Sequence, residues 1–203
     1  MKITAHDLGQ HLGCYGIDTV RTPAIDGLAA AGVRFENANA AAPSCSPSRA
    51  AMMTGRYPHQ VGVLGLTHGD FDWSMHGDED HLSEILSDAG WESSLAGIEH
   101  EGRNPEDVYD QCLTTDSDCH LVTERADEYL TDREGDTPFF LEIGTFAPHR
   151  NPGSESGFGE MPDDFRETAT IPEYLRDEPS AREDIAAYEG AIERFDTAVG
   201  RIL

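Results

Sequence analysis

The chain has 203 residues, of which 39 are Asp or Glu and 14 are Lys or Arg, giving a formal net charge of −25. A surface this negative repels nucleic acid and anionic membranes, which excludes both as partners. The acidic residues are spread along the chain, so we interpret them as a solvated surface suited to high salt, as in a halophile, rather than as a calcium store.

The length suffices for one large domain or two small ones, and we expect one domain over residues 1–203 because no linker or repeat interrupts it. Cys112 and Cys119 could pair, but four cysteines are too few for a disulfide scaffold, and free thiols are expected. No apolar run reaches transmembrane length, and the first residues lack a signal-peptide core. The sequence as written predicts a soluble cytoplasmic product and leaves open the export of a longer one.

The first half of the chain alternates short apolar segments with helical patterns. A short strand is expected at residues 3–5 and another at 33–35. Between them, Thr22 is expected to cap a helix that Gly32 ends. A second helix is predicted to begin at Pro47, and residues 56–80 are expected to be irregular.

The second half continues the alternation. Apolar spacing predicts a helix at 82–89, a strand at 91–96, a polar loop at 99–118, a helix around 122–130 and a buried strand at 139–146. A long Pro-rich and acidic excursion fills 147–179. Ser180 and Glu183 are expected to form a capping box for a last helix, whose apolar residues recur at intervals of three and four up to Ile202.

Strands that alternate with helices predict an α/β fold, with a mainly parallel sheet sandwiched by helices and incomplete at both ends. Ligands of such sheets bind beyond the carboxyl ends of the strands. Chemistry is therefore expected in the loops that follow strands, at residues 6–7, 44–49, 97–100 and 147–150.

The strongest motif is Cys45-Ser46-Pro47-Ser48-Arg49. If Pro47 starts a helix, Cys45 lies just before its N-terminus, where free N–H groups and the helix dipole favour an anion. Arg49 follows one turn later and can reach the same place. A nucleophile, a cation and an anion-binding helix end would then converge, whereas the spacing alone is equally compatible with a buried cysteine beside a surface arginine.

This motif resembles the signature of type I sulfatases of the alkaline phosphatase superfamily, in which a maturation enzyme oxidises the cysteine to formylglycine. The segments at 58–60, 138–141 and 148–150 are similar to the sulfamidase (heparan N-sulfatase) branch. The resemblance runs from about residue 3 to the C-terminus and includes Asp7-Leu8-Gly9, Leu12 to Gly16, Thr22 to Ala29 and Gly32 to Phe35.

The resemblance implies hydrolysis of a sulfate ester or sulfamate of a small sugar or aryl substrate. A hydrated formylglycine at position 45 would attack sulfur with one hydroxyl and release sulfate with the other. A divalent cation, usually calcium in this family, would hold the nucleophile, and Arg49 would orient the hydrated aldehyde. Asp7 matches a metal-ligand position, whereas His6 replaces a second Asp and is either a substitute ligand or a bystander.

Two histidines match catalytic positions of the family. His100 matches one that assists the leaving group or binds sulfate, although Ile98 stands where the family has a lysine, and His149 matches another active-site histidine. His68 is a candidate for lining the substrate pocket. The remaining candidates have no such support and are expected mostly at the surface: His59, His76 and His81.

Three alternatives to the sulfatase prediction remain open. They are a phosphodiesterase or phosphonate monoester hydrolase of the same fold, a noncatalytic remnant, and a hydrolase that uses Cys45 as a thiolate. The family also supplies an Asp-Asn pair of metal ligands from later in its chain, and no such Asp-Asn-Gly segment occurs here. We therefore expect an N-terminal fragment that binds calcium weakly and turns over poorly by itself.

Overall fold

The computed structural model describes two compact units. The sheet unit comprises residues 1–4, 36–117 and 125–144, and the helical unit comprises 5–35, 118–124 and 145–203. Within these units the structure describes residues 1–68, 70, 73–151, 153–154, 157–159, 161 and 168–203, so part of the excursion predicted at 147–179 lies outside the described residues.

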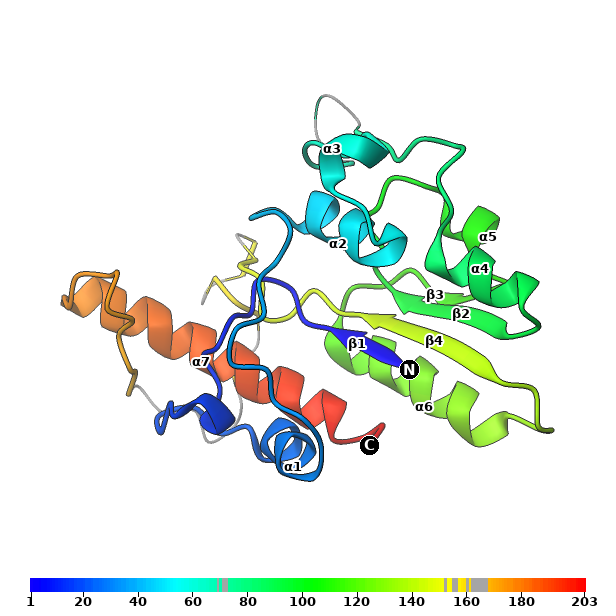
Figure 1. The fold of residues 1–203 in the computed structure, drawn as a ribbon. Helices are drawn as coiled ribbons and strands as arrows, with labels where there is room; N and C mark the ends of the chain where they lie inside the picture. The colour runs from blue at the N-terminus through cyan, green and yellow to red at the C-terminus, as the bar shows by residue number, and fades with distance from the viewer. Residues whose placement is uncertain (69, 71–72, 152, 155–156, 160, 162–167) are drawn as a thin grey trace. The chain divides into compact units, whose positions relative to one another are not determined.

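Four parallel strands form the sheet of the sheet unit, in the order β1-β4-β2-β3 (Figure 1). They are β1 (Lys2–Thr4), β2 (Glu92–Gly97), β3 (Gln111–Thr114) and β4 (Phe139–Gly144). The central strand β4 pairs with β2 from Glu92 opposite Phe139 to Gly97 opposite Gly144, and with β1 on its other side. Because the strands are parallel, β2 and β4 end side by side, and the residues that follow them start from the same edge.

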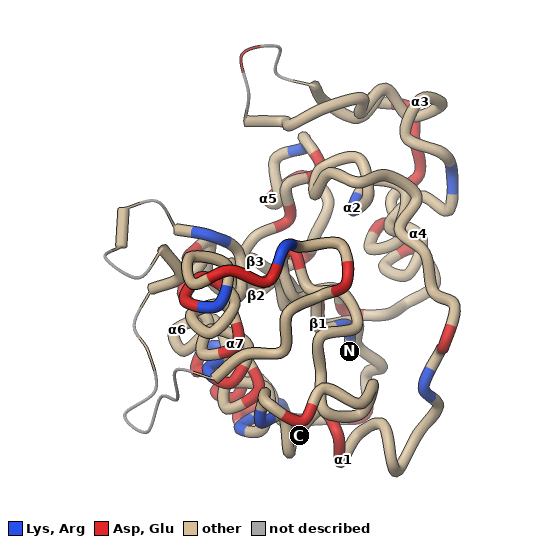
Figure 2. The backbone as a smooth tube through the Cα atoms, turned by 90° about the vertical axis from the view of Figure 1, so that its left-hand side faces the viewer, with Lys and Arg blue, Asp and Glu red and all other residues tan. Residues whose placement is uncertain are grey.

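Helices cover both faces of this sheet, as Figures 1 and 2 show. Helices α2 (Cys45–Thr54), α4 (Leu82–Asp88) and α5 (Pro105–Val108) lie on one side, and α6 (Cys119–Asp132) lies on the other. The predicted α/β fold with a parallel sheet between helices is thereby confirmed. The helix α3 (Pro58–Val61) lies within the segment that was expected to be irregular.

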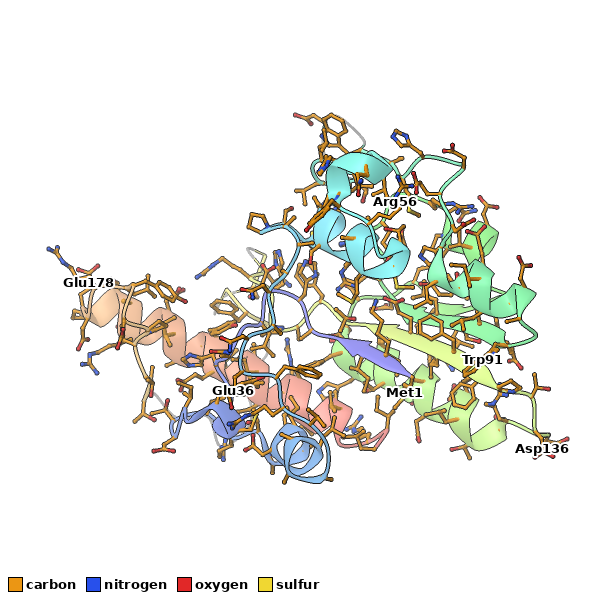
Figure 3. All side chains as sticks on the ribbon, in the orientation of Figure 1. Met1, Glu36, Arg56, Trp91, Asp136 and Glu178 are labelled. Atoms are coloured by element: carbon orange, nitrogen blue, oxygen red, sulfur yellow. The ribbon has the colours of Figure 1, made fainter. Side chains whose placement is uncertain are left out.

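Apolar side chains from α2, β2 and β4 form the core between the sheet and these helices. Met53, Leu95 and Phe140 pack with Val108 and Tyr109, and all five are buried. Arg56, labelled in Figure 3, follows the end of α2 and forms an ion pair with Glu79. These contacts fix α2 against the sheet and so determine where its N-terminus lies within the unit.

The helical unit contains η1 (Gly13–Tyr15), α1 (Pro23–Ala31) and α7 (Pro179–Val199). The apolar face predicted for the last helix is buried, with Ile192, Phe195 and Val199 each under 5% exposed. Asp196 of α7 accepts the backbone N–H groups of Ala24 and Ile25, at 3.1 and 2.8 Å. A carboxylate at these N–H groups stabilises the start of α1, because it also complements the positive end of the helix dipole.

Several predicted local features were wrong. Thr22 occupies the N-cap position of α1, but its hydroxyl donates to Asp26 instead of capping the helix. Residues 33–35 form no strand, and Val33 is 78% exposed, because no neighbouring strand pairs with the segment. The segment predicted as a polar loop at 99–118 contains α5 and β3. The last helix begins at Pro179, which precedes the predicted capping box, since proline suits the first helical position.

The acidic residues recur along the elements of the structure rather than in one segment, as the red positions of Figure 2 show. All four cysteines are free thiols in the structure. Among the described residues, no helix has both the length and the apolar character that crossing a bilayer requires.

Candidate active site

The N-terminus of α2 carries the sequence motif. The helix begins at Cys45, two positions earlier than predicted, and Ser48 donates the first backbone hydrogen bond to Ser44, at 3.1 Å. Pro47 is therefore the third residue of the helix, where its missing N–H has no helical partner to lose. Cys45 is half-buried in the first turn, so its side chain lies at the end of the helix that favours anions.

Arg49 is buried one turn further along α2, with 3% of its surface exposed, which rules out a surface arginine. Its Nη1 donates to the carbonyl oxygen of Ile98 at 3.1 Å, and the Ile98 N–H donates to the carbonyl of Gly144 at 2.9 Å. These bonds anchor the guanidinium beside the ends of β2 and β4. The buried Nη2 forms no hydrogen bond with any residue that the structure describes. A buried cationic N–H donor without a hydrogen-bond acceptor is suited to an anionic ligand.

His100 lies near Cys45 within the sheet unit. The Sγ atom of Cys45 and a ring nitrogen of His100 are within 4.8 Å of each other. Thr67 joins the two segments, because its N–H donates to the Ser46 hydroxyl at 3.3 Å and its hydroxyl to the His100 carbonyl at 3.4 Å. The rings of His100 and His68 lie 4.8 Å apart. The structure therefore brings Cys45 and His100 together, while their predicted catalytic roles stay predictions.

A buried ion pair anchors the loop that carries His100. His100 has a positive φ of 57°, which is uncommon for a residue other than glycine. The next residue, Glu101, pairs with His81 at 2.7 Å, and both side chains are fully buried. The expectation of a surface histidine at position 81 was therefore wrong. His81 and Glu101 are 20 positions apart, and no local pattern in the sequence indicates that they meet.

Glu99 is a second carboxyl group of this loop whose pKa is shifted by its surroundings. Burial raises its pKa from 4.5 to about 7, although the N–H of Glu101 donates to its carboxylate and opposes the rise. Below pH 4.5 the carboxyl group is protonated in both the folded and the unfolded chain. Because the folded chain binds this proton more tightly, the contribution of the protonated Glu99 to stability is lost as the pH rises through 7.

We expect Glu99→Gln to be more stable than the wild type above pH 7, by about 1–3 kcal/mol, and to lose this advantage toward pH 4.5. Urea unfolding at a series of pH values measures the difference. Glu106→Gln, at an exposed position of the same unit, should track the wild type at every pH. A constant difference between Glu99→Gln and the wild type at all pH values would show that Glu99 does not titrate in this way.

Gly144, the last residue of β4, permits the close approach of the Ile98 loop. A Cβ atom at this position would lie 2.1 Å from the Ile98 carbonyl oxygen and 3.3 Å from Nη1 of Arg49.

We expect Gly144→Ala to lower the free energy of unfolding by about 1–3 kcal/mol, because the backbone must shift to admit the methyl group. Thermal unfolding measures the loss, and Gly77→Ala is the matched control because nothing lies within 4 Å of its added Cβ. Equal stability of the two variants would contradict the prediction.

In the helical unit, His6, Asp7 and His149 form a second cluster. His6 is 3% exposed, and its ring lies 4.6 Å from the ring of His149 and 5.5 Å from that of Phe146. The His6 N–H donates to the carbonyl of Ala147 at 3.2 Å, which ties the segment after β1 to the segment after β4. The sequence predicted roles for all three residues, but it did not predict that His149 belongs with His6 and Asp7.

Asp7 presents its carboxylate to this cluster. Its Oδ2 lies 3.4 Å from Nε2 of His149, and the Tyr188 hydroxyl donates to its backbone carbonyl at 2.8 Å. One ligand atom each from His6, Asp7 and His149 lies within 4.8 Å of the others. The three side chains could therefore hold a metal ion. Cys45 belongs to the sheet unit, and its predicted part in metal binding stays a prediction.

Comparisons with known proteins agree on one family. The family model described as "Sulfatase" matches residues 3–203. The chain is 31% identical to N-sulphoglucosamine sulphohydrolase of Homo sapiens over 232 aligned residues, which cover 100% of this chain and 46% of that protein.

Solved structures agree on the fold. A protein in complex with its substrate D-glucosamine-2-N,6-O-disulfate has a TM-score of 0.73 at 18% identity, covering 100% of this chain and 60% of that one. The phosphonate monoester hydrolase of Agrobacterium radiobacter has a TM-score of 0.68 at 18% identity, covering 98% of this chain and 57% of that one. At this identity the likeness concerns the fold alone. The chain spans about half the length of these relatives.

Proposed function

The chain belongs to the sulfatase family, and from this we propose that it hydrolyses a sulfate ester or sulfamate, with Cys45 matured to formylglycine. The observation that carries the proposal is the buried guanidinium of Arg49, whose Nη2 forms no hydrogen bond with the described residues. It lies one turn from Cys45, on the helix end that favours anions. A tetrahedral dianion or its ester is the kind of ligand that such a group stabilises.

The residues of the sheet unit suit the two chemical requirements of the reaction. Hydrated formylglycine would supply one hydroxyl to attack sulfur and a second to release sulfate. Arg49 is fixed by its bond to Ile98, so its charge would need no reorganisation as negative charge develops. The His100 ring, within 4.8 Å of the position 45 side chain, is placed to give a proton to the departing alcohol or amine.

We propose a sulfated amino sugar as the substrate class. The support is the relative from Homo sapiens, whose name specifies N-sulphoglucosamine and which aligns with the whole of this chain. An amine leaves a sulfamate only when it is protonated, and an imidazole titrates near neutral pH and can supply that proton. Proton donation by His100 would therefore matter more for a sulfamate than for an aryl sulfate. The alcohol of an aryl sulfate is a better leaving group and needs less protonation.

A divalent cation is the cofactor that we propose, as is general among sulfatases. Asp7 offers the carboxylate oxygen that a hard cation binds, and it is open to solvent, with 60% of its side chain exposed. His6 and His149 offer imidazole nitrogens beside it. Two nitrogens and one oxygen accommodate a divalent cation, but they do not fit the preference of calcium for oxygen, so the calcium prediction finds no support in these donors.

Mass spectrometry of the tryptic peptide 35–49, from protein produced in its native host, tests the proposal. An aldehyde or its hydrate at Cys45 would indicate that a maturation enzyme acts on this chain, and glucosamine N-sulfate should then be turned over faster than a phosphonate monoester. An unmodified thiol, or preference for the phosphonate, would contradict the proposed sulfatase chemistry.

A further inference from the structure

We propose that His6, Asp7 and His149 form a cation site that selects ions with high affinity for imidazole, such as Zn²⁺ or Co²⁺, over Ca²⁺. The three side chains belong to the helical unit and contribute two nitrogens and one oxygen. The part that this ion would take in catalysis rests on the proposed function, whereas the site itself rests on the contacts of these residues.

The hydrogen bonds of His149 fix which of its nitrogens is available to an ion. Its Nδ1 lies 2.6 Å from the carbonyl oxygen of Arg150, and since a carbonyl only accepts, Nδ1 must carry the hydrogen. In the neutral ring Nε2 then has a lone pair. A ligating histidine commonly donates its other N–H to a backbone carbonyl in this way, which fixes the tautomer and the orientation of the ring.

The lone pair of Nε2 faces a second electron-rich atom. Oδ2 of Asp7 lies 3.4 Å from Nε2 of His149, so the two atoms are neighbouring acceptors when the ring is neutral. Two acceptors repel unless a positive charge lies between them, and a divalent cation would satisfy both. A proton on Nε2 would also bridge the two atoms, as an imidazolium–carboxylate ion pair, so the case for a metal ion rests on the three ligand atoms of His6, Asp7 and His149 that lie within 4.8 Å of one another.

His6 determines the type of cation. It is buried beside Phe146, where a neutral imidazole is accommodated more easily than a second carboxylate would be. Calcium takes six to eight oxygen ligands, whereas imidazole suits zinc and its first-row neighbours. Three protein ligands would leave further positions for water or for a substrate oxygen, as in catalytic zinc sites.

The test is a calorimetric titration of the metal-free full chain with ZnCl₂ and, separately, with CaCl₂, without any substrate. We expect tighter binding of Zn²⁺ than of Ca²⁺, and a loss of Zn²⁺ affinity of at least about 10- to 100-fold in His6→Gln and in His149→Gln. His59→Gln is the matched control, because His59 is exposed in the sheet unit and its loss leaves this site intact. Zinc held elsewhere on the acidic surface would contribute equally to all variants.

A second variant tests the selectivity directly. His6→Asp replaces a nitrogen donor with an oxygen donor, so it should lower the affinity for Zn²⁺ and raise that for Ca²⁺. The visible absorption of bound Co²⁺ should weaken in His6→Gln and in His149→Gln, because it reports the nitrogen ligands. Unchanged Zn²⁺ affinity in both glutamine variants, or tighter Ca²⁺ than Zn²⁺ binding by the wild type, would overturn the inference. These readouts need no turnover, so their failure is distinct from an unmodified thiol in peptide 35–49.

Discussion

Replacing Cys45 with alanine is expected to abolish sulfate release by protein from its native host, with a fall in kcat of about four orders of magnitude or more. The physical reason is that the side chain at position 45 would supply both hydroxyls of the proposed reaction, so no second route to product remains. The fold should persist, because Cys45 is only half-buried in the first turn of α2 and none of the core clusters of the sheet unit includes it among the described residues.

Two comparisons make this prediction specific. Cys112→Ala removes a partly buried thiol from the same unit and should leave turnover unchanged, since Cys112 lies in β3 and packs against the apolar core around Leu95. Thermal unfolding of Cys45→Ala should match the wild type closely. If Cys45→Ala retained activity, position 45 could not be the nucleophile, and neither the formylglycine nor the thiolate mechanism would survive.

The parts of the site that the sequence predicted are those governed by local chemistry. The motif from Cys45 to Arg49 lies within one and a half turns of helix, so spacing alone places a nucleophile and a cation near a helix N-terminus. The error of two residues in the helix start arose because Pro47 suggested the first position, whereas proline is also tolerated at the third. The strand β4 was predicted because its sequence from Phe139 to Gly144 is mostly apolar, as is typical of a buried parallel strand, although it includes Glu142.

The parts that the sequence did not predict depend on contacts between distant residues. Asp196 accepts the N–H groups at the start of α1 from more than 170 positions away, so no local cap reveals it. The burial of Arg49 follows from the packing of α2 on the sheet. The edge strand β3 was missed because it has one neighbour and begins with the exposed Gln111, and therefore lacks a continuous apolar run.

The buried pair of His81 and Glu101 is the clearest case of such a distant contact, and its removal should have the largest effect on stability. Burial raises the pKa of Glu101, and the nearby charge of Glu142 raises it further, whereas the hydrogen bond from His81 acts in the opposite sense. We expect His81→Leu to lower the free energy of unfolding by about 3–5 kcal/mol, because it leaves a buried carboxylate without its partner. Equilibrium unfolding in urea measures this loss.

The double variant His81→Leu/Glu101→Leu separates the electrostatic contribution of the ion pair from the contribution of side-chain packing. Because replacing both members of a buried ion pair with apolar groups of similar volume is often nearly neutral, the double variant should recover most of the stability that His81→Leu loses. His59→Leu, at an exposed position, should change the free energy of unfolding by less than about 0.5 kcal/mol. If the double variant lost as much free energy of unfolding as His81→Leu and Glu101→Leu lose together when each is measured alone, the two side chains would contribute by packing alone. If it recovers stability but loses turnover, the pair has been retained because it holds the loop that carries His100.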